Sequence, residues 1–385
     1  MVKNMKYTKA KLPDICTIKT GKHDANHANK EGKYRFYTCS NQYSMCDTYS
    51  FTGESVIVPG NGDIGLVFYY DGEFDAYQRT YVLNDITILP KYLFYHMQLY
   101  WRNFNDQKKF GSTVKYVRMS NFTNYEISYP SIEEQERIVA KIEELFSDLD
   151  NAVETLNATK AQLKLYKQAV LKSAFSRCIE LKKAEDLCFF ITKGTTPKKA
   201  EFQLEDKSIP FIKVYNLTFD GSLDFTIEPT FIAKSIHETS LARSIVYPGD
   251  VLMNIVGPPM GKVSIVPSSY DEWNINQAIA RFRCKEELNN RYLAYFLMSS
   301  ETVEKMSKQT KATAGQFNLT LETCRNIDIP VCSINEQLRI VDNLDTQLTA
   351  YNNIEKTVND ALQQATAMRQ SILKQAFEGR LLNGK

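Results

Sequence analysis

The sequence predicts an α+β protein in which two mixed α/β domains are separated by two long α-helices that form an antiparallel coiled coil, as a pseudo-twofold tandem duplication. Three observations predict this fold. Residues 131–175 recur at residues 333–377 without a gap, at an offset of 202 (333 − 131). Each copy has the heptad spacing of a long helix, and a block rich in aromatic and β-branched residues precedes each copy. A gapless match of this length indicates internal duplication.

The two blocks are expected to fold as short strands and turns with one helix each. In the first block we expect strands at 55–58, 66–70 and 79–83 and a helix near 91–99. In the second block we expect strands at 251–254, 263–266 and 278–282 and a helix near 291–298. Gly53 matches Gly249 at an offset of 196, and Gln78 matches Gln277 at an offset of 199. The growing offset indicates loop insertions in the second block.

The duplicated stretches are expected to be continuous helices from 132 to 175 and from 334 to 377, each roughly 66 Å long at 1.5 Å per residue. Each copy opens with a Ser followed three residues later by a Glu, the pattern of a capping box, and neither contains Pro or Gly. A compact domain seldom needs a helix much beyond about 20 residues. We therefore favour pairing of the two helices over the alternative that each is only a core helix of its own domain.

The expected pairing seam consists of apolar residues at heptad spacing. Its members are Ile138, Ile142, Leu145, Leu149, Leu156, Leu163, Ile340, Leu344, Tyr351, Val358 and Ile372. We expect polar replacement of Ile138, Ile142 and Leu145 to separate the two blocks before it unfolds either.

Composition excludes some classes of protein and leaves others open. The 47 basic and 45 acidic residues nearly balance, which does not exclude nucleic-acid binding, because local charge matters more than the total. The eight cysteines show no C-x-x-C motif and no zinc spacing, and the first residues contain no apolar signal core. We expect reduced thiols, a cytoplasmic location and no membrane contact.

Several short motifs resemble known sites but lack a required feature. The glycines of residues 60–65 match G-x-G-x-x-G, but a strand follows where a dinucleotide fold requires a helix, so a tight strand connection is the better interpretation. Residues 257–263 resemble a P-loop but are one residue short and have Val263 in place of Ser or Thr. Residues 254–260 lack the spacing of an N-P-P-aromatic methyltransferase motif. We expect no catalytic residues.

His23 and His27 are spaced so that a helix could place both imidazoles on one face. We expect no third ligand nearby, and their neighbours are polar. A solvated loop without a metal ion is therefore the favoured interpretation.

Polar, basic, glycine-containing loops recur at equivalent places in the two blocks. Lys, Ser and Thr suit phosphate contacts, whereas Asn, Gln and Arg can read base edges in the major groove. Each loop alone is commonly only a solvated surface, but the recurrence favours DNA binding. The candidate DNA-binding residues are Lys22, Gln78, Arg79, Lys108, Lys109, Ser112, Lys193, Thr195, Lys198, Asn276, Gln277, Lys311 and Gln316.

Two motifs of the duplicated stretches carry a family resemblance. Ile-x-x-x-Ser-Ile-x-Glu-Gln-x-Arg-Ile-Val occurs at 127–139 and 329–341, and Leu-Lys-x-Ala-Phe at 171–175 and 373–377. With the twofold order of block and helix, the chain resembles the specificity subunit of type I restriction-modification systems. The first copy departs from the pattern at residues 128–130, where Ser-Tyr-Pro stands in place of the usual Ile-Pro.

The resemblance implies a division into four segments with separate roles. These are a first target-recognition domain (1–130), a central conserved helical spacer (131–178), a second target-recognition domain (179–331) and a C-terminal conserved helical spacer (332–385). Each target-recognition domain would read one half of an asymmetric bipartite DNA site, while the helices set the spacing and dock the modification subunits.

The same resemblance implies partners for a non-catalytic chain. These are double-stranded DNA, two methyltransferase subunits and restriction/translocase subunits. No cofactor is expected on this chain, because S-adenosylmethionine, ATP and Mg would be bound by the partner subunits. Three alternatives stay open: a specificity subunit of a related bipartite-site (type IIB-like) system, a structural adaptor that binds no DNA, and a methyltransferase fragment.

Overall fold

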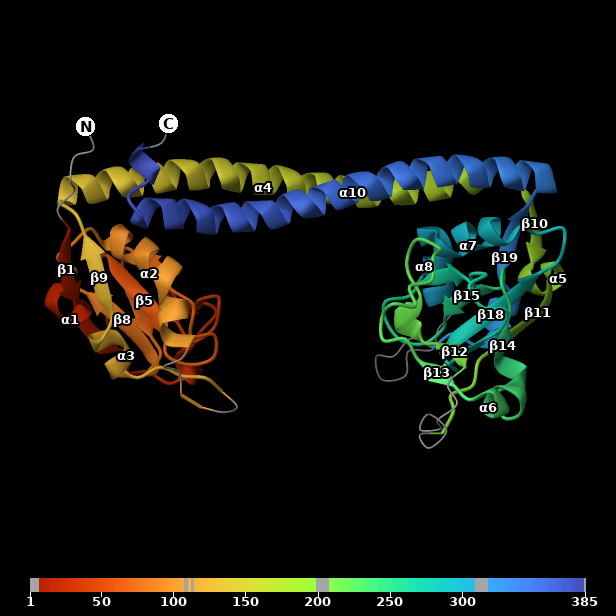
Figure 1. Ribbon diagram of the computed structural model, residues 1–385, viewed down its shortest axis with the longest axis horizontal. Helices are drawn as coiled ribbons and strands as arrows, with labels where there is room; N and C mark the ends of the chain where they lie inside the picture. The colour runs from red at the N-terminus through yellow and green to blue at the C-terminus, as the bar shows by residue number, and fades with distance from the viewer. Residues whose placement is uncertain (1–6, 107–109, 112–113, 199–207, 309–317, 384–385) are drawn as a thin grey trace. The chain divides into compact units, whose positions relative to one another are not determined.

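The computed structural model describes residues 7–106, 110–111, 114–198, 208–308 and 318–383. Contacts divide the chain into two compact units, one formed by Met1–Asn157 with Asn359–Lys385 and the other by Ala158–Val358. Each unit holds one block together with a part of each long helix (Figure 1).

The described residues of the first unit form three small sheets. The largest is antiparallel, in the order β2 (Thr17–Thr20), β8 (Thr80–Asn84), β5 (Ser55–Pro59) and β6 (Phe68–Tyr70). A mixed sheet has the order β4 (Ser44–Cys46), β3 (Tyr34–Tyr37) and β7 (Phe74–Ala76), and β1 (Thr8–Lys11) pairs with β9 (Glu126–Tyr129). The helices of this block are α1 (Leu12–Ile15), η1 (Ala25–His27), α2 (Pro90–Asp106) and α3 (Met119–Thr123), and η5 (Leu381–Asn383) follows the second long helix.

The second unit repeats this arrangement. Its antiparallel sheet has the order β11 (Cys188–Lys193), β18 (Ile279–Cys284), β15 (Val251–Asn254) and β16 (Val263–Ile265). Its mixed sheet has the order β13 (Phe231–Ile232), β12 (Ile209–Ile212), β17 (Trp273–Ile275) and β14 (Ile245–Val246), and β10 (Glu180–Lys183) pairs with β19 (Asp328–Val331). The helices are α5 (Ala184–Leu187), η3 (Val214–Asn216), α6 (Lys234–Glu238), η4 (Ala242–Ser244), α7 (Asn290–Met298), α8 (Ser300–Lys308) and α9 (Leu321–Arg325). The shared strand order confirms that the two blocks are copies.

The expected strands and helices of the blocks are present, with shifted ends. The largest difference is α2, which runs on to Asp106 instead of ending near residue 99. Its added turns bury Trp101 and Asn105, so tertiary packing extends the helix. Strands β2 and β11 were not expected, and β11 places the candidate Lys193 on a strand rather than in a loop.

The long helices α4 (Ile132–Phe175) and α10 (Ile334–Phe377) have the expected bounds. At the start of α10, the backbone N–H of Glu336 donates to Ser333 Oγ at 3.3 Å, which is one half of the expected capping box. At the start of α4, the N–H of Glu134 donates to the Ser131 carbonyl instead.

Segments of α4 and α10 pack side by side and antiparallel within each unit (Figure 1). In the first unit, the Arg369 guanidinium lies 4.3 Å from the ring centroid of Phe146 and pairs with Asp150. In the second unit, Tyr166 Oη donates to Gln347 Oε1 at 3.4 Å. The predicted pairing of the helices is therefore present in both units.

The seam residues differ in how deeply they are buried. Ile138, Ile142, Ile340, Leu344, Tyr351, Val358 and Ile372 are buried, whereas Leu145, Leu149, Leu156 and Leu163 are half-buried. The buried residues near the helix ends also belong to the cores of the blocks, as Ile142 and Ile372 do with Leu93 and Trp101. The ends of both helices are therefore part of the block cores. For these ends, the alternative that each long helix is a core helix of its own domain is correct.

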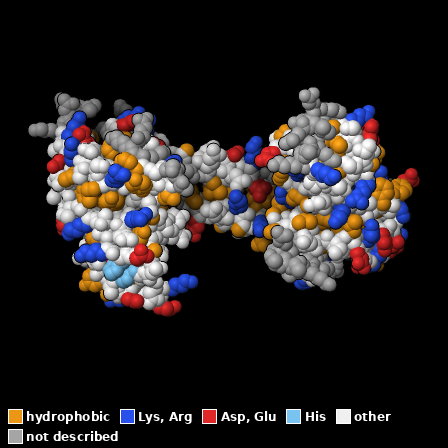
Figure 2. All heavy atoms as spheres, turned by 90° about the horizontal axis from the view of Figure 1, so that it is seen from below, with side chains coloured by type: hydrophobic (Ala, Val, Ile, Leu, Met, Phe, Trp, Pro, Cys, Tyr) orange, Lys and Arg blue, Asp and Glu red, His pale blue; other side chains and the backbone are white. Residues whose placement is uncertain are grey.

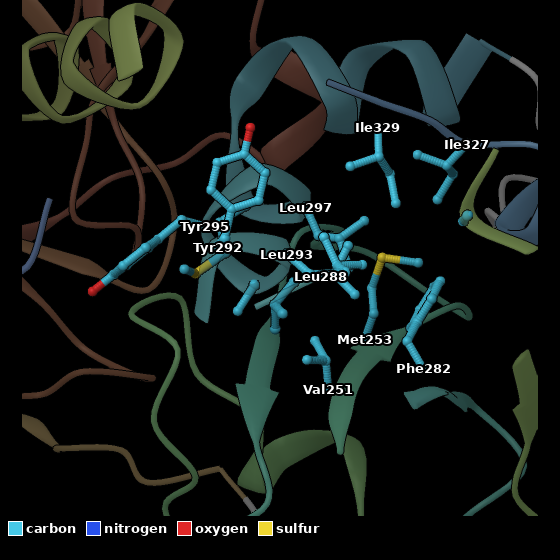
Figure 3. Packing of buried hydrophobic residues seen from close by; sticks show 14 of the residues in the cluster. Val251, Met253, Phe282, Leu288, Tyr292, Leu293, Tyr295, Leu297, Ile327 and Ile329 are labelled. Carbon is cyan, nitrogen blue, oxygen red and sulfur yellow. The ribbon is translucent and has the colours of Figure 1, made fainter. Parts of the chain in front are cut away.

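The core of the second unit lies between its helices and the antiparallel sheet (Figure 3). Tyr292, Leu293 and Leu297 on α7 pack in one cluster with Val251 and Met253 of β15. Phe175, at the end of α4, adds an edge-on ring contact to Tyr292 with centroids 5.1 Å apart. The equivalent contact in the first unit joins Phe377 to Tyr92 at 5.2 Å. The last residue of each long helix therefore anchors that helix to a block.

The Glu-Gln pair of the duplicated motif has a structural role. Gln337 is fully buried; its Oε1 accepts from the Asn289 N–H at 2.9 Å, and its Nε2 donates to the carbonyls of Glu287 and Cys332, each at 2.9 Å. Gln135 likewise accepts from the Leu89 N–H and donates to the Pro130 carbonyl. Each glutamine joins the start of a long helix to the loop that precedes α2 or α7.

Replacing Gln337 with Ala should destabilise the second unit by about 2–3 kcal/mol. The substitution leaves one backbone N–H and two carbonyls without their partner in a partly buried place, and each unsatisfied group carries a desolvation penalty. Urea unfolding measures the loss. The control is Gln364→Ala on an exposed face of α10, expected to change stability by less than about 0.5 kcal/mol. Equal effects of the two substitutions would contradict this role of Gln337.

Two whole-chain expectations can be compared with the structure. All eight cysteines are free thiols. In the described part of the chain, every helix is too short or too polar to cross a bilayer.

Candidate nucleic-acid interface

In the first block, two polar segments are held together at one end of the sheet. The N–H of Gly21 donates to the Thr80 carbonyl at 3.1 Å, and the N–H of Gln78 donates to the His23 carbonyl at 2.9 Å. A Cβ on Gly21 would lie 1.8 Å from the Ala76 carbonyl oxygen, so the close approach requires glycine.

These backbone contacts bring together three candidate residues that are far apart in sequence. Lys22 follows Gly21, and Gln78 and Arg79 form the turn between β7 and β8; all three side chains are exposed. Gln78 Nε2 also donates to Asp24 Oδ2 at 3.3 Å. We call Lys22, Gln78 and Arg79 the first loop cluster.

The second block repeats this junction. The N–H of Gly194 donates to the Ile279 carbonyl at 3.1 Å, and a Cβ on Gly194 would lie 2.1 Å from the Ile275 carbonyl oxygen. Thr195 follows Gly194, and exposed Gln277 occupies the turn between β17 and β18. The expected match of Gln78 with Gln277 is therefore a structural equivalence.

A surface hollow of about 430 Å³ adjoins the first loop cluster. The hollow is lined by Gly60, Asn61, Gln78, Arg79, Tyr81, Val114, Tyr116 and Val117. The N–H of Gly60 donates to the Arg79 carbonyl, and the N–H of Val117 donates to the Gly60 carbonyl. In the second block, Ile255 and Leu319 make the equivalent bonds to Ala278 and Ile255. Val117 in the first block and Leu319 in the second follow a basic, glycine-containing stretch. Their bonds therefore hold the following segment beside the turn that contains Gln78 or Gln277, which we call the glutamine turn.

Sequence reasoning missed two arginines at this end of the blocks. In the first block, exposed Arg118 lies 4.1 Å from the ring centroid of Phe110 and donates to Tyr116 Oη at 3.1 Å. In the second block, Arg243 Nε donates to Thr195 Oγ1 at 3.2 Å. The alternation of aromatic and basic residues in 110–118 could have indicated Arg118. Arg243 lies far from Thr195 in sequence and carried no signal.

A further pair of arginines lies on the sheet of the second block. Arg281 and Arg283 on β18 stack on Phe190, with guanidinium-to-centroid distances of 4.4 and 4.7 Å. Burial lowers the pKa of Arg281, whereas hydrogen bonds from Arg283 to the Asp250 carboxylate raise the pKa of Arg283. Both side chains stay cationic at neutral pH. Figure 2 shows Lys and Arg side chains on the visible face of both blocks.

The remaining candidates fall into three groups. Lys193 is the last residue of β11 and Lys198 lies in the following loop; both are exposed. Asn276 is half-buried and its Oδ1 accepts from the Ala278 N–H at 3.1 Å, so this side chain stabilises the turn; its contact with DNA stays a prediction. Lys108, Lys109, Ser112, Lys311 and Gln316 lie outside the described residues.

The histidine pair differs from its expected solvated loop. Asp75, far from the pair in sequence, places its carboxylate against both imidazoles, with Oδ2 3.3 Å from His23 Nε2 and 3.6 Å from His27 Nε2. The expectation that no third ligand is nearby is therefore wrong.

Comparisons with known proteins agree with the duplicated architecture. The family model "Type I restriction modification DNA specificity domain" matches residues 4–165 and again residues 179–364. The chain is 27% identical to the type I restriction enzyme EcoDI specificity subunit of Escherichia coli, over 96% of this chain and 87% of that protein. It is also 27% identical to the EcoBI specificity subunit of the same species, over 76% of this chain and 66% of that protein.

Two solved structures share the fold. A chain from a structure on complex assembly and conformational transition of the type I R-M system aligns with a TM-score of 0.76 at 20% identity, covering 97% of this chain and 98% of that chain. The HsdS subunit from Thermoanaerobacter tengcongensis aligns with a TM-score of 0.54 at 18% identity, covering 97% of both chains.

Proposed function

Because the chain belongs to the type I restriction-modification DNA specificity family, we propose that its two blocks read the two dissimilar halves of one interrupted DNA site. The protein is the DNA sequence-specificity subunit of a type I restriction-modification complex, and it is a non-catalytic subunit of that complex. Its partners are DNA and the modification and restriction subunits.

One observation carries the proposal of two half-sites. The same backbone junction occurs in both blocks but presents different side chains, with Lys22, Gln78 and Arg79 in the first and Thr195, Gln277 and Arg243 in the second. Gln pairs bidentately with adenine, Arg with guanine, and Lys contacts phosphates. The shared backbone junction with different side chains supports two DNA-reading domains that recognise different sequences.

The long helices fit the role of a spacer. Half-site separation on a duplex follows from the distance between reading heads, and α4 and α10 are the elements that continue from one unit into the other. We assign to these helices the docking of two methyltransferase subunits in the cytoplasm. Those partners would bind S-adenosylmethionine and flip the target adenine, and the restriction subunits would bind ATP and Mg.

Methylation mapping tests this function directly. The chain is co-expressed with its methyltransferase subunit, and modified adenines are mapped across a genome by long-read sequencing. An interrupted motif with two dissimilar halves is expected. An uninterrupted motif would refute the proposal that each block reads one half-site. If no methylation appears and DNA binding by the chain is insensitive to salt, the structural-adaptor alternative is favoured, because phosphate contacts make log affinity fall with log salt.

Single substitutions in the glutamine turns should each affect one half-site. Gln78→Ala is expected to relax or lose bases in one half of the methylated motif, and Gln277→Ala in the other, because a bidentate base contact contributes about 1–3 kcal/mol of discrimination. Gln42→Ala, at an exposed position of the first block, is the control and should leave the motif unchanged. The assignment fails if both turn variants alter the same half.

A further inference from the structure

The first block gathers three metal-binding side chains from two segments that are distant in sequence. His23 lies just before η1, His27 is the last residue of η1, and Asp75 lies on β7. One imidazole nitrogen of each histidine and a carboxylate oxygen of Asp75 all lie within 4.8 Å of one another. The histidine side chains visible in Figure 2 lie at the surface of this block.

Asp75 is unusual because its carboxylate is completely buried. Oδ1 accepts from the Ala76 N–H at 2.8 Å, and Oδ2 accepts from Ser50 Oγ at 3.3 Å. Within the described ranges, His23 and His27 are the only basic side chains within ion-pair distance of this carboxylate. Burial of an anion is costly unless a positive charge accompanies it.

The second block shows that a charge at this position is not required by the fold. Asp75 lies opposite Phe36 in the parallel β3–β7 pair, and Asn274 lies opposite Phe211 in the parallel β12–β17 pair. Asn274 is also fully buried but is a neutral amide. The second block also places a histidine, His237, against Asn274, so the carboxylate is the feature that the first block adds to the shared framework.

We propose that His23, His27 and Asp75 bind a divalent transition-metal ion, with Zn²⁺ the best match and solvent as the fourth ligand. Tetrahedral Zn²⁺ with bonds of about 2.0–2.1 Å separates its ligand atoms by roughly 3.3 Å, close to the observed 3.3 and 3.6 Å between the imidazole nitrogens and Asp75 Oδ2. Imidazole nitrogen favours zinc and its neighbours over Mg²⁺ and Ca²⁺, which prefer oxygen ligands.

Metal binding requires the rings to turn and His27 Nε2 to give up its 3.1 Å hydrogen bond with Thr48 Oγ1. The imidazoles are stacked with centroids 3.8 Å apart and planes 9° apart, so their lone pairs do not yet converge on one point. The His23 side chain is 37% exposed and the His27 side chain 23% exposed, which leaves the outer ring room to turn. Because the His23 carbonyl accepts from the Gln78 N–H, an ion here would fasten the first loop cluster to β7.

Metal titration of the full chain tests the site without using DNA. We expect one equivalent of Zn²⁺ to bind in calorimetry and to protect the amides of residues 22–27 from hydrogen exchange. His23→Asn and His27→Asn, at half-exposed positions, should each weaken binding at least 10-fold, as should Asp75→Asn, which places in the first block the amide found at Asn274. Asp71→Asn, at an exposed carboxylate nearby, is the matched control and should bind as the unaltered chain does.

Cobalt spectroscopy separates this site from the cysteines. Co²⁺ bound to His23, His27 and Asp75 should give visible d–d bands without the intense near-ultraviolet band of a thiolate ligand. The proposal is overturned if the chain binds no Zn²⁺ stoichiometrically, if binding survives both histidine substitutions, or if the cobalt spectrum shows thiolate ligation. Loss of folding in Asp75→Asn alone would leave the two histidine variants to decide.

Discussion

Deleting residues 155–161 from α4 together with residues 355–361 from α10 is expected to shorten the gap between the two methylated half-sites by about three base pairs. Seven residues are two helical turns and about 10 Å of helix, and base pairs are spaced by about 3.4 Å. The deletion keeps the heptad phase. It spares the Phe146–Arg369 contact of the first unit and the Tyr166–Gln347 contact of the second.

The gap is read from the methylation motif of the variant, co-expressed with its methyltransferase subunit. Both half-site sequences should be unchanged, because the deleted segments contain no residue of either block. Deleting residues 155–161 from α4 alone is the control; it leaves helices of unequal length and is expected to abolish methylation. A double deletion that methylates with the original gap would refute the spacer role.

Replacing Ile142 with Asn is expected to destabilise the first unit by roughly 3–5 kcal/mol. Ile142 is fully buried in one cluster with Leu93 and Trp101, so the substitution removes core packing and buries an amide without a designed partner. The seam pattern alone predicts separation of the blocks before unfolding. The packing of Ile138 and Ile142 into the first block's core replaces that expectation with unfolding of the first unit itself.

Urea unfolding gives the loss of stability, and hydrogen exchange shows where it occurs. Faster exchange should be confined to the first unit. Leu165→Asn is the matched control, because that side chain on α4 is 72% exposed, and its effect should stay within about 0.5 kcal/mol. Normal stability of the first unit in the Ile142 variant would contradict the assignment of this helix segment to the core.

The parts of the fold that local sequence determines were predictable. The long helices begin and end where the sequence predicts, because a heptad pattern without Pro or Gly defines a helix and the duplication repeats its ends. Similarly, Gln78 of the first block could be matched with Gln277 of the second from the sequence. The four predicted domain ranges stay a prediction.

The parts that depend on strand pairing were not predictable. Asp75 reaches His23 because residue 23 forms a parallel bridge with Tyr77, just after β7. It reaches His27 because that ring packs on Phe36 of β3, which pairs with β7. Nothing in the sequence around these segments indicates those pairings. Arg243 reaches Thr195 in the same way, across two segments of the second block. Strands β2 and β11 are short and lack strong alternation, so their sequences resembled the loops that follow them. Contacts between distant segments are what a single sequence reveals least.

The closing of the first unit by residues 359–385 has a consequence for synthesis on the ribosome. The second unit is formed by one continuous segment, residues 158 to 358. The core of the first block is covered by Ile372, Leu373 and Phe377, which are synthesised near the end of the chain. The usual order, in which the N-terminal domain folds first, is therefore reversed for the final step. During translation the earlier-made block keeps an apolar face open until the last helix emerges, which makes the nascent chain a client for chaperones that shield such surfaces.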